Sequence, residues 1–225
     1  MTAATLRSLT TTHSDDHDGA ADPPLWLVGL DLASVLLFAV EGGLMAVSAG
    51  FALVGILAVA FLSALGGGLI RDLLVQRHPP AALGSVAYPA VALAGGLLAA
   101  FGHDALAVLM PGMRMPLDAA GLGMMCGIGA VVALGRHMSS LGAILLGTIS
   151  AVGGGVIRDI MTGDVPMVMR HDTAAVAAAA GAAVTVVTMR LGVRSQVAAV
   201  LGATTCVGLS LAATYLGWRL PGLTA

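Results

Sequence analysis

The sequence predicts an all-α integral membrane protein with seven transmembrane helices, an inverted repeat of two three-helix units plus a seventh helix. One observation is composition, because 58% of the residues are hydrophobic, 10% are charged and the mean hydropathy is +0.96. Soluble domains carry about 25% charged residues, so the composition excludes a soluble fold. The other observation is a ten-residue segment that occurs twice in the chain.

The predicted spans follow from the length of the apolar stretches. A membrane-spanning helix needs about 20 mostly apolar residues, and the chain from Leu25 onward divides into seven such stretches where charge, Pro or Gly accumulates. They run roughly from Leu25 to Val47, Phe51 to Val75, Ser85 to Phe101, Pro116 to Leu134, Ser140 to Met161, Thr173 to Leu191 and Gln196 to Tyr215.

These spans divide the chain into five parts. We expect a disordered tail at residues 1–24, because this segment is rich in Thr, Asp and His and ends in a helix-start signal, Asp22-Pro23-Pro24. The other parts are the first three-helix repeat at 25–102, a connecting loop at 103–115, the second repeat at 116–191, and the seventh helix with a C-terminal tail at 192–225.

The repeat is the strongest signal in the sequence. It reads SALGGGLIRD at residues 63–72 and SAVGGGVIRD at residues 150–159, with eight of ten positions identical. Each copy contains three spans, and an odd number of crossings forces the second copy to enter the membrane from the opposite side. Inverted repeats bring equivalent residues near a pseudo-two-fold axis in the membrane plane, where transport proteins keep their sites. The same offset of 87 residues aligns Asp31 with Asp118, Gly42 with Gly129, Gly55 with Gly142 and Pro79 with Pro166.

The repeated segment places polar groups on one helix face. Residues four apart share a face, so one stripe is Ser63, Gly67 and Arg71, and its counterpart is Ser150, Gly154 and Arg158. Three successive glycines cost roughly 1 kcal/mol each relative to Ala, permit a kink, and uncover backbone carbonyls for a passing cation. The alternative is that the small residues only pack two helices closely together.

The charges of the motif require partners, because a charge within a membrane is costly unless it is paired or functional. Adjacent helix residues do not face each other, so we expect neither Arg to pair with the Asp that follows it. The predicted pairs are Arg71 with Asp159 and Arg158 with Asp72, across the pseudo-two-fold axis. If the motifs lie at opposite membrane faces, each Arg instead faces water or headgroups at its own end.

Three further carboxylates lie within the predicted spans. Glu41 is in the middle of the first span, and Ile128 occupies the equivalent position in the second unit, so Glu41 breaks the repeat symmetry. It either lines a path or pairs with an Arg. Asp31 and Asp118 are near the starts of their spans, where a carboxylate is favourable, and we expect them to act as helix-capping charges.

Several function classes are not indicated. The ten basic residues are all Arg and form no basic patch, so nucleic acid is not an expected partner. Cys126 and Cys206 resemble small core residues rather than a disulfide or a metal site. No hydrolase, phosphate-loop or dinucleotide motif stands in a supporting context. We therefore expect no enzyme activity, no cofactor and no metal site.

The seven spans, the duplicated three-helix unit and the doubled Gly-Gly-Gly-x-Ile-Arg-Asp motif resemble the prokaryotic branch of the trimeric intracellular cation channel (TRIC) family. The resemblance covers Leu25 to Tyr215. It implies a homotrimer in which each protomer has its own hourglass-shaped pore for monovalent cations, above all potassium. It also implies pore kinks at Gly66, Gly67, Gly68, Gly153, Gly154 and Gly155.

In the same resemblance, Ser63, Ser150, Arg71 and Arg158 are candidates to face the pore. An Arg beside a cation path repels the ion, so the path must compensate with carbonyls or with carboxylates such as Asp72, Asp159 or Glu41, or the Arg must be paired. Similar bacterial proteins are described as glycine transporters, so a carrier for a small zwitterion such as glycine is the alternative function. The expected location is the bacterial inner membrane, with membrane lipids as partners.

Overall fold

The computed structural model describes residues 23–109, 112, 114–170 and 173–216, and within these ranges the regular elements are all α-helices. Seven of the described helices are long and apolar enough to cross a membrane, which confirms the predicted fold class. Most of the tail expected at residues 1–24 lies outside the described residues. The helices are α2 (Leu25–Ser48), α3 (Leu53–Leu74), α4 (Ala81–Gly84), α5 (Ala87–Leu109), α6 (Arg114–Gly135), α7 (Ser140–Met161), α8 (Met167–Arg170), α9 (Thr173–Arg190) and α10 (Ser195–Tyr215).

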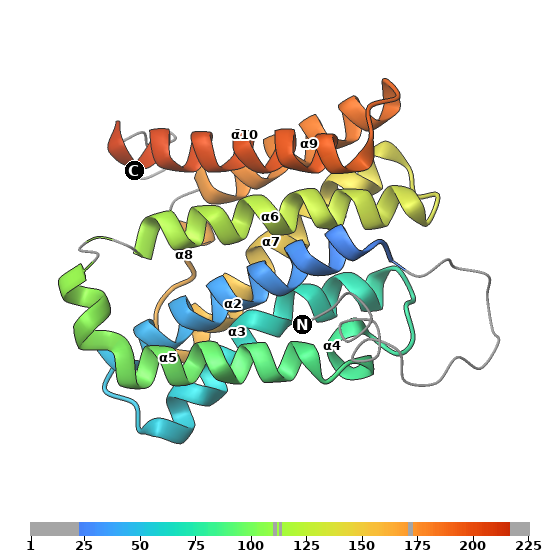
Figure 1. Cartoon of the computed structure of the whole chain (residues 1–225). Coiled ribbons are helices and arrows are strands. Elements are labelled where there is room, and N and C mark those ends of the chain that lie inside the picture. The colour runs from blue at the N-terminus through green and yellow to red at the C-terminus, as the bar shows by residue number, and fades with distance from the viewer. Residues whose placement is uncertain (1–22, 110–111, 113, 171–172, 217–225) are drawn as a thin grey trace.

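The long helices lie side by side in one bundle (Figure 1). The two units meet where α3 packs against α7 and α2 packs against α6, while α10 packs against α6 and α9. Short connections reverse the chain between successive long helices, and three such reversals separate α3 from α7. These two helices hold equivalent positions in the repeat and therefore run in opposite directions, as an inverted repeat requires.

The structure corrects the loop predicted at residues 103–115. α5 continues through His103 to Leu109, and α6 begins at Arg114. The segment after Asp104 contains only Ala, Leu and Val, of which Ala and Leu favour a helix strongly. The helix ends shortly before Pro111, because the residue that precedes a proline is disfavoured in the α-conformation.

Each unit also contains a short helix that the sequence analysis did not predict. α4 follows Pro79-Pro80, and α8 follows Pro166. The two short helices occupy nearly equivalent places in the repeat, between the second and third long helices of each unit. Their first backbone N–H groups bind carboxylates of the site described below.

The helix ends follow from residues with a left-handed backbone conformation. α2, α7 and α9 each end two residues before a glycine, and these glycines have φ values of 77°, 79° and 86°. Glycine adopts this conformation without steric cost and commonly terminates helices. Gln76 and His137 adopt the same left-handed conformation just after the ends of α3 and α6, with φ values of 56° and 58°.

The glycine triplets form the crossing point of α3 and α7. A Cβ atom placed on Gly67 would collide with the backbone carbonyl oxygen of Ser150, and one placed on Gly154 would collide with that of Ser63. The contact is therefore reciprocal, and it brings the two backbones together where a side chain would not fit. The α-helical conformation continues through both triplets. The geometry thus supports close packing as one role of the glycines, and the kink remains a prediction.

The crossing predicts different outcomes for two alanine substitutions within one triplet. Gly67→Ala places a methyl group against the fixed carbonyl of Ser150, so we expect a loss of about 1–3 kcal/mol of stability, the range for an overpacked core. The measurement is thermal unfolding of the purified protein in detergent.

Gly68→Ala is the matched control. Its Cβ would meet only the end of Arg71 at 3.8 Å and the end of Met125 at 3.9 Å, which is ordinary contact distance. Since Ala favours a helix over Gly by about 1 kcal/mol, this variant should be as stable as the wild type or more stable. Equal stability of the two variants would contradict the proposed role of Gly67.

Candidate functional site

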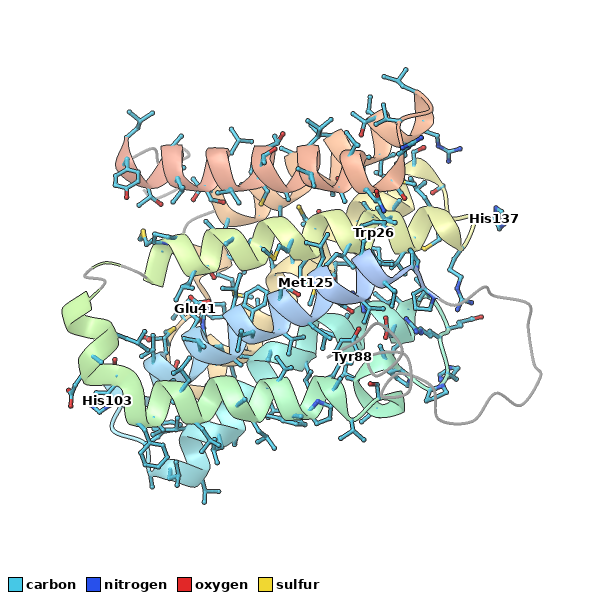
Figure 2. All side chains as sticks on the ribbon, viewed as in Figure 1. Trp26, Glu41, Tyr88, His103, Met125 and His137 are labelled. Atoms are coloured by element: carbon cyan, nitrogen blue, oxygen red, sulfur yellow. The ribbon has the colours of Figure 1, made fainter. Side chains whose placement is uncertain are left out.

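The repeated motifs place their two arginines on opposite sides of the α3–α7 crossing. Each Arg lies four residues beyond the central glycine of its triplet, which is about 6 Å along a helix axis. Because the helices are antiparallel, Arg71 lies toward one end of the bundle and Arg158 toward the other. The labelled His137 and His103 lie at these opposite ends (Figure 2).

Arg71 is buried in a cluster of carboxylates. Its guanidinium donates from Nη1 to Oδ1 of Asp31 at 2.9 Å and from Nη2 to Oδ2 of Asp31 at 3.0 Å. It also donates from Nε to Oδ1 of Asp72 at 2.9 Å. The hydroxyl of Tyr88 donates to Oδ2 of Asp31 at 3.0 Å. Side chains from α2, α3 and α5 thus meet around a guanidinium whose side chain is only 2% exposed.

Arg158 forms the equivalent cluster in the second unit, with one added group. Its Nε donates to Oδ1 of Asp159 at 2.9 Å, and its Nη1 contacts Oδ1 of Asp118 at 3.4 Å. The same Nη1 lies 2.6 Å from Oε1 of Glu41. Glu41 belongs to α2 of the first unit, so this ion pair joins the two halves of the protein. Of the two roles considered for Glu41, pairing with an Arg is observed.

The Asp of each motif also holds the short helix that follows. The backbone N–H of Ala81, the first residue of α4, donates to Oδ2 of Asp72 at 2.8 Å. The backbone N–H of Met167, the first residue of α8, donates to Oδ2 of Asp159 at 2.7 Å. Both carboxylates therefore satisfy an otherwise unpaired N–H at a helix start while they bind an arginine.

The predicted cross-pairs, Arg71 with Asp159 and Arg158 with Asp72, are wrong. Each Arg instead binds the Asp that follows it in sequence, at 2.9 Å in both units. The expectation rested on the directions of the Cβ atoms, but the long Arg side chain extends well past its Cβ and folds toward the neighbouring carboxylate. In addition, the two motifs lie on opposite sides of the crossing, so their charges do not meet.

The capping role expected for Asp31 and Asp118 is also wrong. Neither α2 nor α6 has an acidic residue in its first turn, and both carboxylates bind an arginine of the repeated motif instead. The sequence analysis therefore missed them as members of the site, and it missed Tyr88 entirely. The repeat could have indicated that the two Asp residues belong to the site, because the 87-residue offset between the motifs also relates Asp31 to Asp118.

Ser63, Ser150 and Met125 lie near the crossing, between the two clusters. The hydroxyl of Ser150 donates to the carbonyl of Gly67 at 3.4 Å and to the sulfur of Met125 at 3.7 Å. The hydroxyl of Ser63 is buried and has no hydrogen-bond partner among the described residues. Figure 2 shows Met125 between Glu41 and Tyr88 along the molecule.

A small cavity adjoins each arginine cluster. The cavity beside Arg158 has a volume of about 20 Å³, and the one beside Arg71 has a volume of about 10 Å³. The linings correspond through the repeat, since Asp118, Gly155 and Asp159 of the first cavity match Asp31, Gly68 and Asp72 of the second. A cavity of this size has room for about one water molecule.

The clusters do not form a metal site of the usual kind. Within the described residues, no group of three or more His, Cys, Asp or Glu side chains is arranged to hold a metal ion. The carboxylates contact a guanidinium and helix N–H groups instead. What the arrangement offers is two buried, charge-compensated clusters on either side of a glycine crossing.

Comparison with known proteins was made by sequence and by fold. A family model described as glycine transporter matches residues 28–104 and 115–190. A UPF0126 membrane protein of Deinococcus radiodurans is 43% identical over 156 residues, covering 68% of this chain and 72% of that protein. The UPF0126 inner membrane protein YadS of Escherichia coli is 29% identical over 199 residues, which cover 85% of this chain and 93% of that protein.

Two solved channel structures share the fold. A TRIC cation channel, solved to explain conductance, superposes with a TM-score of 0.78 at 32% identity, covering 88% of this chain and 97% of that chain. The TRIC trimeric intracellular cation channel orthologue from Rhodobacter sphaeroides superposes with a TM-score of 0.79 at 27% identity. The match covers 86% of this chain and 100% of that chain.

The geometry of the clusters predicts that the equivalent residues Asp31 and Asp118 differ in importance. Removing one partner of a buried ion pair costs about 3–5 kcal/mol, and Asp31 makes both hydrogen bonds to the end of Arg71. Asp118 makes one longer contact, and Glu41 remains on the same nitrogen. We therefore expect Asp31→Ala to lower the unfolding temperature more than Asp118→Ala, in a thermal unfolding series in detergent. Equal losses would show that the contact geometry does not set the stability.

Proposed function

Because the chain belongs to the prokaryotic branch of the TRIC family, we propose that it is a channel for monovalent cations, above all potassium, with one pore in each protomer. The observation that carries this proposal is the antiparallel crossing of the two glycine triplets between two compensated arginine clusters. The chain is an integral membrane protein of the bacterial inner membrane type, as its apolar helices and relatives indicate. The proposed path follows α3 and α7 from one cluster to the other.

The clusters remove the main electrostatic objection to a cation path. An isolated Arg in a membrane interior would repel a passing cation. Here Arg71 contacts two carboxylates and Arg158 contacts three, among the described residues. Neither cluster therefore carries a net positive charge when its acids are ionised, and both ends of the proposed path tolerate a cation.

The crossing supplies groups that favour a dehydrated cation. Backbone carbonyls in a helix become accessible where glycine leaves them without side-chain cover, and carbonyl oxygens replace the hydration shell of monovalent cations in channel filters. The carbonyls of Ser63 and Ser150 are covered by the opposing glycines in this structure, so they would reach a cation only after the two helices separate. Each described cavity holds only about one water, so we propose that conduction requires α3 and α7 to move apart at this contact.

A carrier for glycine is the second candidate, because the matching family model has the description glycine transporter. Each cluster contains both a guanidinium and carboxylates, the two charge types that a zwitterion would need. A carrier of this kind would exchange the Arg–Asp contacts for contacts with the substrate carboxylate and ammonium groups. The two candidates differ in rate and in current, so one experiment separates them.

The protein reconstituted in a planar bilayer with KCl should give discrete single-channel current steps. In a KCl gradient, the reversal potential should lie near the potassium equilibrium potential, because the compensated arginines leave cations favoured over chloride. Addition of glycine should leave the current unchanged. Saturable glycine uptake into proteoliposomes without current steps would reject the channel and support the carrier.

We also propose that the protein is a homotrimer, as the trimeric channel orthologue from Rhodobacter sphaeroides supports. Several helices carry large apolar side chains on their exposed faces, including Leu97, Leu98 and Phe101 of α5. Native mass measurement of the protein in detergent should give three copies of the chain. A species that stops at one or two copies, with helical content intact, would reject the trimer.

A further inference from the structure

The two repeat-related arginines are surrounded by different numbers of acids. Arg71 contacts two carboxyl groups, and the neutral hydroxyl of a tyrosine completes its cluster. Arg158 contacts three carboxyl groups, which belong to Glu41, Asp118 and Asp159. The second cluster therefore holds one acid more than the first around a single guanidinium.

Glu41 and Asp118 share one nitrogen of Arg158. Oε1 of Glu41 lies 2.6 Å from Nη1, and Oδ1 of Asp118 lies 3.4 Å from the same Nη1. The two carboxyl groups are also hydrogen-bonded to each other, and their side chains are only 4% and 16% exposed. Two carboxylates that share a buried site repel each other strongly, and a hydrogen bond between two carboxyl groups requires a proton on one of them. The pair therefore holds one proton.

A single proton on this pair equalises the charge of the two clusters. With all acids ionised, the Arg158 cluster would have three negative charges for one positive charge, whereas the Arg71 cluster has two for one. A buried charge is far more costly than a neutral group unless it is paired. The charge count and the contact between the carboxyl groups thus point to the same proton.

Few other titratable groups face the pair. Arg158 and Asp159 of α7 both act on it, and the thiol of Cys206 on α10 lies close enough to sense the charge of Asp118. The neighbouring α8 and α9 contribute only uncharged side chains to the cavity beside Arg158, namely Met167, Val168 and Ala174.

The two remaining helices that pack against α2 bring no cation to the pair. α3 carries its charged residues toward the opposite end of the bundle. α5 carries His103 and Asp104 at this end, but they pair with each other and are 42% and 93% exposed. Figure 2 shows the labelled Glu41 inside the bundle and His103 at its end. Among the described side chains, Arg158 is therefore the only cation that faces the pair.

The structure also provides a place for the proton to leave. Asp118 lines the cavity beside Arg158, which has a volume of about 20 Å³ and room for about one water molecule. On release, the O–H bond of the carboxyl group breaks, its electron pair stays on the carboxylate, and the proton passes to water. Glu41 is outside this lining, so it exchanges its proton through its hydrogen bond with Asp118.

We propose that Glu41 and Asp118 together bind one proton at neutral pH, and that its release as the pH rises increases the cation current. The proton site stands independently of the proposed channel function, whereas its effect on the current rests on that function. Release adds one negative charge at the wall of the cavity, and a negatively charged, low-dielectric passage raises the local concentration of cations. The Arg71 cluster lacks a third acid and shares no proton between carboxyl groups.

Infrared spectroscopy of the full-length protein in detergent tests the proton site directly. A protonated carboxyl group absorbs apart from carboxylates, and exchange into D₂O shifts its band. The wild type should show this band at neutral pH, where exposed acids are ionised, and should lose it reversibly as the pH rises. Glu41→Gln and Asp118→Asn should each lack the band, because either change leaves Arg158 with two ionised acids.

Two control variants remove an acid from elsewhere and should retain the band. Asp31→Asn changes the repeat-equivalent of Asp118 in the other cluster, and Asp104→Asn changes an exposed acid at the same end of the bundle. Circular dichroism of each variant establishes that its helices are intact. Asp104→Asn also serves if Asp31→Asn does not fold, because its carboxylate lies at the surface.

Single-channel recording in low-salt KCl tests the effect on the current. The wild-type cation current should rise by roughly two-fold or more over the pH range in which the infrared band disappears, a small part of the 10–10³-fold effect of charged clefts. Glu41→Gln should lose this rise, and Asp104→Asn should keep it. High salt should reduce the rise in the wild type, because ions screen the added charge.

The outcomes separate the proton site, its effect and the proposed function. Absence of the band in the wild type at neutral pH, or its persistence in both Glu41→Gln and Asp118→Asn, rejects the proton site. A band that behaves as expected, with the same pH response of the current in the wild type and Glu41→Gln, rejects the effect on conduction while the channel stands. If the wild type gives no cation current at any pH, the proposed function fails, and the infrared band still decides the proton site.

Discussion

Arg71 and Arg158 are almost fully buried, and the rest of the structure is arranged around the carboxylates that this burial requires. A guanidinium in an apolar surrounding is costly unless acids and hydrogen bonds compensate it. Each Arg therefore recruits the Asp that follows it and an Asp from the first helix of its unit. These contacts fix the rotation of α2 against α3 and of α6 against α7, and through Ala81 and Met167 they also anchor the short helices.

The glycine crossing and the arginine clusters depend on each other. The antiparallel approach of α3 and α7 is close because the central glycines leave room for the opposing carbonyls. That approach sets the two motifs on opposite sides of the contact, and so directs each Arg toward its own end of the bundle. Only the central glycines meet backbone, because Ile157 packs against Gly66 and Ile70 packs against Gly153 on either side of them.

The duplicated architecture is symmetric in its backbone and asymmetric in the side chains that complete its two arginine clusters. Both units repeat the Arg, the two Asp partners and the bond to the short helix. They differ at Tyr88 and Glu41, where one unit completes its cluster with a hydroxyl and the other with a carboxylate from its neighbour.

The sequence by itself determined the seven spans, the repeat, the inversion of the second unit and the residue types of the site. These follow from the length of apolar stretches and from an 87-residue offset, which are properties of the chain read along its length. Only the tertiary structure decided which acid binds which arginine, because pairing depends on helix rotation and on the reach of long side chains around a helix. It likewise placed Glu41 of the first unit against Arg158 of the second, a contact that joins residues with no relation in the repeat. The sequence predicted only part of the role of Asp31 and Asp118. The repeat linked these residues to each other but not to the arginines that they bind.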